Sequence, residues 1–142
     1  MKNYTKTIGS LLVITFLMSS CGVMFGGSKY NAIIEVKNHP NAIITANGNK
    51  LGSGKVTALL PRNESLNIQI SEEGCETKTQ TFYKKFRTGN FILSVLSWGL
   101  IGLGVDLGTG AAYKPDHINN QEITKLNTKT FLVDIDYSEC QK

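Results

Sequence analysis

The side chains that could do chemistry in this chain are few and far apart. Neither of its two histidines, His39 and His117, has a cysteine or a carboxylate at the spacing of a metal-binding motif. His39 precedes Pro40 in a predicted turn, and we interpret both histidines as surface residues. The sequence also lacks a Gly-x-Ser-x-Gly nucleophile motif, a phosphate-binding loop and a His-Glu-x-x-His zinc motif. We therefore expect no enzyme activity, no cofactor, no metal and no small-molecule substrate.

Carboxylates offer two further candidate sites. Asp134 and Asp136 share one face of the last predicted strand, where they could bind a cation together with Glu139. Calcium sites gather six or more oxygen ligands, and nothing nearby completes such a set, so we interpret this face as solvated. Asp106 stands among glycines, where it is either a buried functional carboxylate or a turn or cap residue. The second reading is favoured, because aspartate accepts backbone N–H bonds at turns and helix starts.

The first twenty residues have the layout of a secretory signal. Lys2 and Lys6 form a positive start, residues 8–17 are mostly apolar, and residues 18–20 lead into Cys21. The apolar part is roughly ten residues, whereas a membrane-spanning helix needs about twenty, so we expect residues 1–20 to be cleaved off. Removing Lys2 and Lys6 lowers the formal net charge from +4 to +2. No aromatic and basic platform for nucleic acid is present, so a nucleic-acid partner is not expected.

The signal ends in Leu17-Met18-Ser19-Ser20-Cys21, which resembles a lipobox. This resemblance to bacterial lipoproteins implies a covalent lipid on Cys21 and cleavage before it; the alternative is an ordinary secretory signal. Two or more acyl chains are what stable membrane anchoring needs. Gly22 stands where the sorting rule of enteric bacteria has aspartate for inner-membrane retention, which implies the outer membrane, facing the periplasm. Residues 21–29 have the glycine-rich composition of a flexible tether.

Two cysteines, Cys75 and Cys140, remain once Cys21 carries lipid. An exported protein reaches a compartment that permits disulfides, so the two can form a bridge. The alternative is two separate cysteines, one or both free, and the sequence alone does not decide between these readings because the Cα–Cα distance is unknown.

The rest of the chain, residues 30–142, has the pattern of one small domain of short strands. Apolar and polar residues alternate most clearly from Leu66 to Ile70 and from Thr128 to Tyr137, and Asn47-Gly48 predicts a hairpin turn. Further strands are expected at 32–37, 42–46, 56–60 and 77–86. Short strands separated by turns predict a mainly β fold, a small antiparallel β-sandwich.

Residues 32–86 carry a resemblance to the PEGA domain, a β-sandwich module of exported bacterial proteins. The resemblance implies a prealbumin-like sandwich with a binding or structural role rather than catalysis. The matching positions are Pro40, Ala42, Asn47-Gly48, Leu51-Gly52 and Gly74.

Residues 89–113 form an unusual insertion, which is apolar and rich in glycine. About fifteen uncharged residues from Phe91 to Val105 are short for a membrane span. In the favoured account, Asn90 caps a helix over 91–103, a second short helix or turn holds 106–112, and the pair covers an open sheet face as core. In the other, the segment is exposed and contacts the membrane interface or another protein. The candidate contact residues are Phe91, Leu96, Trp98, Ile101 and Tyr113.

Spacing within the insertion has two further implications. Gly104 and Gly108 have the small-xxx-small spacing that lets helices approach closely. Residues 98–113 resemble a recurring segment of small exported bacterial proteins, which implies no particular activity.

We therefore expect a membrane-anchored, non-catalytic binding or structural accessory of the cell envelope with a protein partner there. The alternative is a membrane-active or immunity-type lipoprotein that uses residues 91–113 directly.

Overall fold

A computed structural model describes residues 27–138 and residue 140 of the chain. The predicted signal at 1–20, the predicted lipid site Cys21 and Glu139 lie outside the described residues. Within the helix described below, the side chains of Asn90, Leu93, Ser94, Ser97 and Trp98 are also outside that description.

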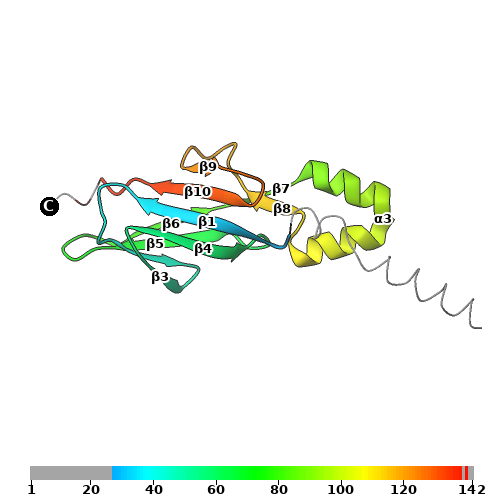
Figure 1. Cartoon of the computed structure of the whole chain (residues 1–142). Coiled ribbons are helices and arrows are strands. Elements are labelled where there is room, and N and C mark those ends of the chain that lie inside the picture. The colour runs from blue at the N-terminus through cyan, green and yellow to red at the C-terminus, as the bar shows by residue number, and fades with distance from the viewer. Residues whose placement is uncertain (1–26, 139, 141–142) are drawn as a thin grey trace, which may run out of the picture.

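The chain is mainly β, as predicted, and its strands form two four-stranded sheets and a two-stranded ribbon (Figure 1). The first sheet has the order β4 (Lys55–Pro61), β1 (Lys29–Val36), β10 (Thr130–Ile135) and β9 (Ile123–Lys125). The second has the order β3 (Asn49–Ser53), β2 (Ile43–Ala46), β5 (Leu66–Ser71) and β6 (Lys78–Phe82). The ribbon pairs β7 (Lys84–Phe86) with β8 (Tyr113–Pro115).

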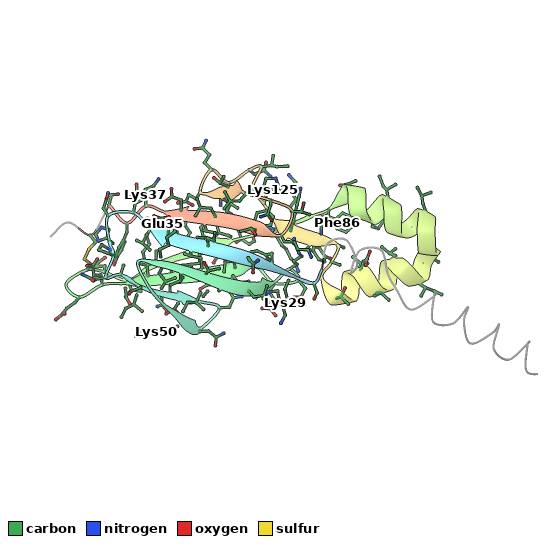
Figure 2. The ribbon with its side chains drawn as sticks, in the orientation of Figure 1. Lys29, Glu35, Lys37, Lys50, Phe86 and Lys125 are labelled. Carbon is green, nitrogen blue, oxygen red and sulfur yellow. A yellow bond between two sulfur atoms is a disulfide. The ribbon has the colours of Figure 1, made fainter. Side chains whose placement is uncertain are left out.

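One apolar core lies between the two sheets. Alternation along the strands places Ile34 of β1 and Val133 of β10 on the same buried side, and Ile68 of β5 joins the same cluster from the other sheet. Each such side chain contributes about 1.5–3 kcal/mol when it is fully buried. Polar side chains alternate with them on the outer faces (Figure 2). The apolar face of each sheet is therefore buried in this core.

The strand directions differ from the prediction at the centre of the first sheet. We expected an antiparallel arrangement, but β1 and β10 run parallel, with Ala32 beside Phe131 and Ile34 beside Val133. All other pairs are antiparallel. Turn signals fix the direction of strands that follow one another, whereas β1 and β10 are joined by no turn. The single strand expected over 77–86 is also wrong, because Tyr83 interrupts it and the two halves pair with different partners.

Cys75 and Cys140 are joined by a disulfide, with their Cα atoms 5.3 Å apart. Cys75 lies in the loop between β5 and β6, and Cys140 follows β10, so the bridge ties the end of the first sheet to the second. Cys140 is buried, and its backbone N–H donates to the carbonyl of Tyr137. The segment that follows β10 toward the C-terminus lies at the end of the sheets opposite α3 (Figure 1).

The insertion forms the helix α3 (Thr88–Thr109), which is broken at Gly99 into two arms. Gly99 has φ 59° and ψ −145°, a conformation that glycine adopts without a side-chain clash. The arms, residues 88–98 and 100–109, run out from the end of the sheets and return as a hairpin (Figure 1). The helix ends at Gly110, which has φ 83°. Within the described part of the chain, no helix has the length and apolar character to cross a bilayer.

The favoured account of the insertion was wrong in three respects. The helix begins at Thr88 and its N-cap residue is Arg87, so Asn90 lies inside the helix and does not cap it. The helix does not stop near residue 103, and the hairpin does not cover a sheet face as core, because several of its large apolar side chains are exposed. The physical reason is that each sheet already buries its apolar face against the other sheet. Among the described residues, nothing lies within 4 Å of a Cβ placed on Gly104 or Gly108, so neither glycine makes a close approach within this part of the chain.

Candidate functional site

The far part of the α3 hairpin presents apolar side chains to solvent. Leu96 is 78% exposed, Leu100 83% and Ile101 78%, and these three flank the bend at Gly99. No charged residue occurs between Arg87 and Asp106. Single exposed leucines are common, but a cluster on one projecting element marks a surface that contacts another apolar phase. Other apolar residues exposed along the arms are Ile92, Val95, Val105 and Leu107.

The predicted contact residues separate into two groups. Leu96 and Ile101 lie exposed near the bend, as a contact surface requires. Phe91 and Tyr113 are half-buried at the base, where the ring of Phe86 contacts both, with centroids 4.9 Å and 5.9 Å away. These rings hold the hairpin to the β7–β8 ribbon. The side chain of the fifth candidate, Trp98, lies outside the described part of the structure.

The base of the hairpin is fixed by backbone hydrogen bonds. The N–H of Arg87 donates to the carbonyl of Ala112 at 2.8 Å, and the N–H of Ala112 donates to the carbonyl of Asp106 at 3.1 Å. The guanidinium of Arg87 also donates to the carbonyl of Ala111 at 3.4 Å. Burial lowers the pKa of Arg87, and the buried Asp106 carboxylate opposes that shift. Asp106 is thus a buried carboxylate that stabilises this cation, and its backbone carbonyl closes the helix end.

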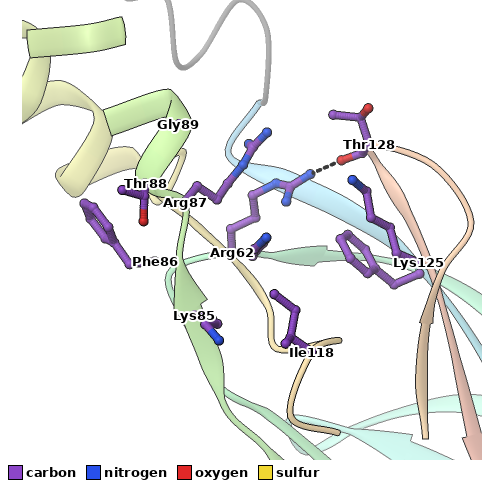
Figure 3. Close-up of a pocket in the computed structure, with 11 residues that line it drawn as sticks. Arg62, Lys85, Phe86, Arg87, Thr88, Gly89, Ile118, Lys125 and Thr128 are labelled. Atoms are coloured by element: carbon purple, nitrogen blue, oxygen red, sulfur yellow. Dashed lines mark hydrogen bonds between the residues drawn. The ribbon is translucent and has the colours of Figure 1, made fainter. Parts of the chain in front are cut away.

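A cavity of about 360 Å³ lies where the hairpin meets the sheets (Figure 3). Its walls come from β7, the first residues of α3, β8 and the segments around β9 and β10. Arg62 follows β4, Arg87 lies between β7 and α3, and Lys125 ends β9, so these side chains reach the cavity from separate segments (Figure 3). Five cationic side chains line it, namely Arg62, Lys85, Arg87, Lys114 and Lys125.

Arg62 is the most buried of these cations, with 1% of its surface exposed. Its guanidinium donates to the backbone carbonyls of Lys29 at 3.2 Å, Thr128 at 3.2 Å and Tyr113 at 3.5 Å. These carbonyls satisfy its N–H groups but do not neutralise its charge. Burial lowers the pKa of Arg62 to about 10, and the neighbouring charge of Arg87 acts in the same direction. The surroundings of Arg62 are therefore electropositive.

The lysines of the cavity reinforce this potential. The pKa of Lys114 is lowered by burial and then by Lys125, Arg87 and Lys85, while Asp116 opposes the shift. Lys85 lies 3.7 Å from the carboxylate of Asp116. Among the described residues, neither Lys114 nor Lys125 forms an ion pair. Crowded cations without matching carboxylates favour binding of an anion.

The histidines are not the surface residues that we expected. Nδ1 of His39 lies 2.7 Å from Oε2 of Glu72, and the side chain of His39 is only 16% exposed. Glu72 is 33 positions away in the sequence, so no local spacing could reveal this pair. His117 is also half-buried, with its ring 5.8 Å from that of Phe131. Both rings contribute to packing.

The possible metal ligands form two groups, one around His39 and one near the end of β10. His39, Glu72 and Cys140 lie with their ligand atoms within 4.8 Å of one another, but the sulfur of Cys140 is bonded to Cys75 and is not a thiolate. On the last strand, Asp134 pairs with Lys37 at 2.5 Å, and Asp136 is exposed. The first group is therefore part of the disulfide-bonded structure, whereas Glu139 of the second group lies outside the described residues.

Comparison with protein-family models, with curated proteins and with solved structures finds no match.

Proposed function

We propose that the protein is a non-catalytic accessory of the bacterial cell envelope that is held by lipid on Cys21 and docks on the membrane through the α3 hairpin. The observation that carries this proposal is the exposure of Leu96, Leu100 and Ile101 at the end of an uncharged projecting element. Moving such side chains out of water is worth about 1.5–3 kcal/mol each.

The dimensions of the hairpin fit one leaflet of a bilayer. Each arm has about ten residues and spans roughly 15 Å, because an α-helix rises about 1.5 Å per residue. The hydrocarbon core of a bilayer is about 30 Å thick, so the hairpin is long enough to enter one leaflet and too short to cross both. It would lie in the membrane as an interfacial element rather than as a span.

The distribution of apolar and basic residues along the hairpin favours a lipid surface over a protein partner. The bend is apolar, whereas the cations Arg62, Arg87 and Lys114 are confined to the base. A bilayer surface has the complementary order, with hydrocarbon inside and anionic phosphates outside. We therefore propose that the apolar surface of the hairpin binds a bilayer.

The start of the described chain and the base of the hairpin lie at the same end of the molecule. Arg62 donates both to Lys29, at the start of β1, and to Tyr113, just after the hairpin. Cys21 precedes Lys29 by eight positions, and an extended segment of that length reaches about 27 Å. Lipid and hairpin can thus engage one membrane together. We propose a PEGA-like sandwich for residues 32–86, which would form the rigid body behind these two contacts.

Vesicle flotation of the mature chain with Cys21→Ser tests the hairpin without the lipid. We expect the wild-type hairpin to float with phospholipid vesicles and a Leu96→Ser/Leu100→Ser variant to lose at least about tenfold in partitioning. Serine is preferable to an acidic residue because it adds no charge. The matched control is Leu59→Ser on β4, since Leu59 is 61% exposed but lies outside the hairpin.

Circular dichroism should show the same folded spectrum for all variants, because the substituted side chains are exposed. Equal flotation of the hairpin variant and the control would contradict the proposal. Absence of flotation for the wild type would also reject it and would point to an envelope protein as the partner of the hairpin.

A further inference from the structure

The cationic cavity lies where lipid headgroups would be if the hairpin enters a bilayer. Thr88 and Gly89 begin α3 and also line the cavity, so the cavity opens at the foot of the first arm (Figure 3). The volume of about 360 Å³ is within the range of small-ligand sites. A group bound there would thus sit at the boundary between the apolar hairpin and the sheets.

Charge defines the class of ligand. Five cations line the cavity, and the carboxylates that act on them are Asp106, beside Arg87, and Asp116, beside Lys85. Arg62 is held in place by three backbone carbonyls. This cation is therefore preorganised, and the site has an excess of positive charge. Arginine and lysine together bind phosphate oxygens well, arginine through its planar fork and lysine as a point charge.

Packing alone does not explain this cluster. Cations that serve only the fold are normally paired with carboxylates or point to water, whereas Arg62 is 1% exposed and its acceptors are uncharged carbonyls. Lys114 is half-buried and lies among like charges. Asp106 and Asp116 offset only part of the charge of the five cations, and a bound anion would offset the remainder.

We infer that this cavity binds the phosphate of an anionic phospholipid headgroup while the α3 hairpin lies in the same leaflet. The inference rests on the proposed function and adds the lipid class to it. The hairpin supplies affinity for any bilayer, and the cavity supplies the preference for an anionic one.

The test compares vesicles of phosphatidylcholine with vesicles that also contain phosphatidylglycerol, using the mature chain with Cys21→Ser. We expect tighter binding to the anionic vesicles. A Lys114→Gln/Lys125→Gln variant should lose about 25-fold on anionic vesicles and keep its binding to neutral ones, since each basic residue near an anionic surface contributes about a factor of five. The control Lys50→Gln/Lys78→Gln removes the same charge away from the cavity and should lose less than about threefold.

Free ligands distinguish a lipid headgroup from a dissolved anion. Inorganic phosphate and glycerol phosphate are titrated into the same protein without vesicles, and the amide signals of Arg62, Lys114 and Lys125 are followed by NMR. We expect weak binding that the cavity variant abolishes. Saturation by free phosphate at concentrations that leave vesicle binding unchanged would overturn the lipid assignment.

The two proposals fail in different ways. If the hairpin variant and the wild type bind neutral vesicles equally, the proposed function is wrong. If the wild type binds neutral and anionic vesicles equally, or the cavity variant behaves like its charge-matched control, this inference is wrong while membrane docking can still hold.

Discussion

Gly110 lies so close to Asn63 that a Cβ atom on the glycine would be 2.8 Å from both the backbone nitrogen and the Cβ of that residue. This contact joins the end of α3 to the turn after β4 and sets the position of the hairpin relative to the first sheet. Gly110 also has φ 83°, so an L side chain would be strained there even without the contact.

Gly110→Ala should therefore lower the free energy of unfolding by about 2 kcal/mol or more. Urea denaturation of the mature chain measures this change. Gly108→Ala is the matched control, because its Cβ would meet nothing within 4 Å and alanine favours the helix by about 1 kcal/mol. Similar stabilities for the two variants would contradict the assigned packing.

Gly99→Ala should act on the hairpin alone. Gly99 has a positive φ, but a Cβ there has nothing within 4 Å, so the cost is backbone strain of about 1–3 kcal/mol without a clash. We expect altered helicity and weaker vesicle binding, with little change in the thermal midpoint of the sheets. A large fall in that midpoint would show that the bend is part of the folding core.

The Cys75–Cys140 bridge should stabilise the two sheets substantially. It closes a loop with a sequence separation of 65, for which the loss of chain entropy in the unfolded state predicts about 4 kcal/mol. Cys75→Ala/Cys140→Ala should lower the free energy of unfolding by that order, and reductant should have the same effect on the wild type. Reductant should leave the double variant unchanged. Equal stability of oxidised and reduced wild type would refute the prediction.

Tyr30 should ionise late in alkaline titration. Burial raises its pKa to about 12, although the nearby Arg62 cation opposes the shift. Unfolding returns the phenol to its ordinary pKa of 10.0, so the stability from this shift is complete below pH 10 and is lost as the pH rises to about 12. Ultraviolet titration of wild type against Tyr30→Phe isolates this residue. A difference that titrates near pH 10 would mean that Tyr30 is not buried.

Local patterns in the sequence predicted the strands well. Leu66, Ile68 and Ile70 alternate with polar residues, and all three are buried in β5. Asn47 and Gly48 both have positive φ in the turn between β2 and β3, as that dipeptide predicts. Such features depend on neighbouring residues, so a single sequence contains the information. The direction of β10 beside β1 depends on residues about 100 positions apart, and no local pattern records it.

The cationic cavity could not be predicted for the same reason. Its cations come from separate segments, since Arg62 follows β4 whereas Lys85 and Lys125 belong to β7 and β9. The exposure of the hairpin also could not be predicted, because it depends on whether the two sheets leave an apolar face open.

The parallel pairing of β1 with β10 also has a consequence for biogenesis. The first strand of the described chain lies between β4 and the last strand, so the first sheet cannot be completed until residues 130–135 have been made. Contacts between such distant residues give a high contact order, which slows folding. If residues 1–20 direct export, as predicted, late closure of the first sheet would keep the polypeptide unfolded during transfer, and β10 would complete the fold after it.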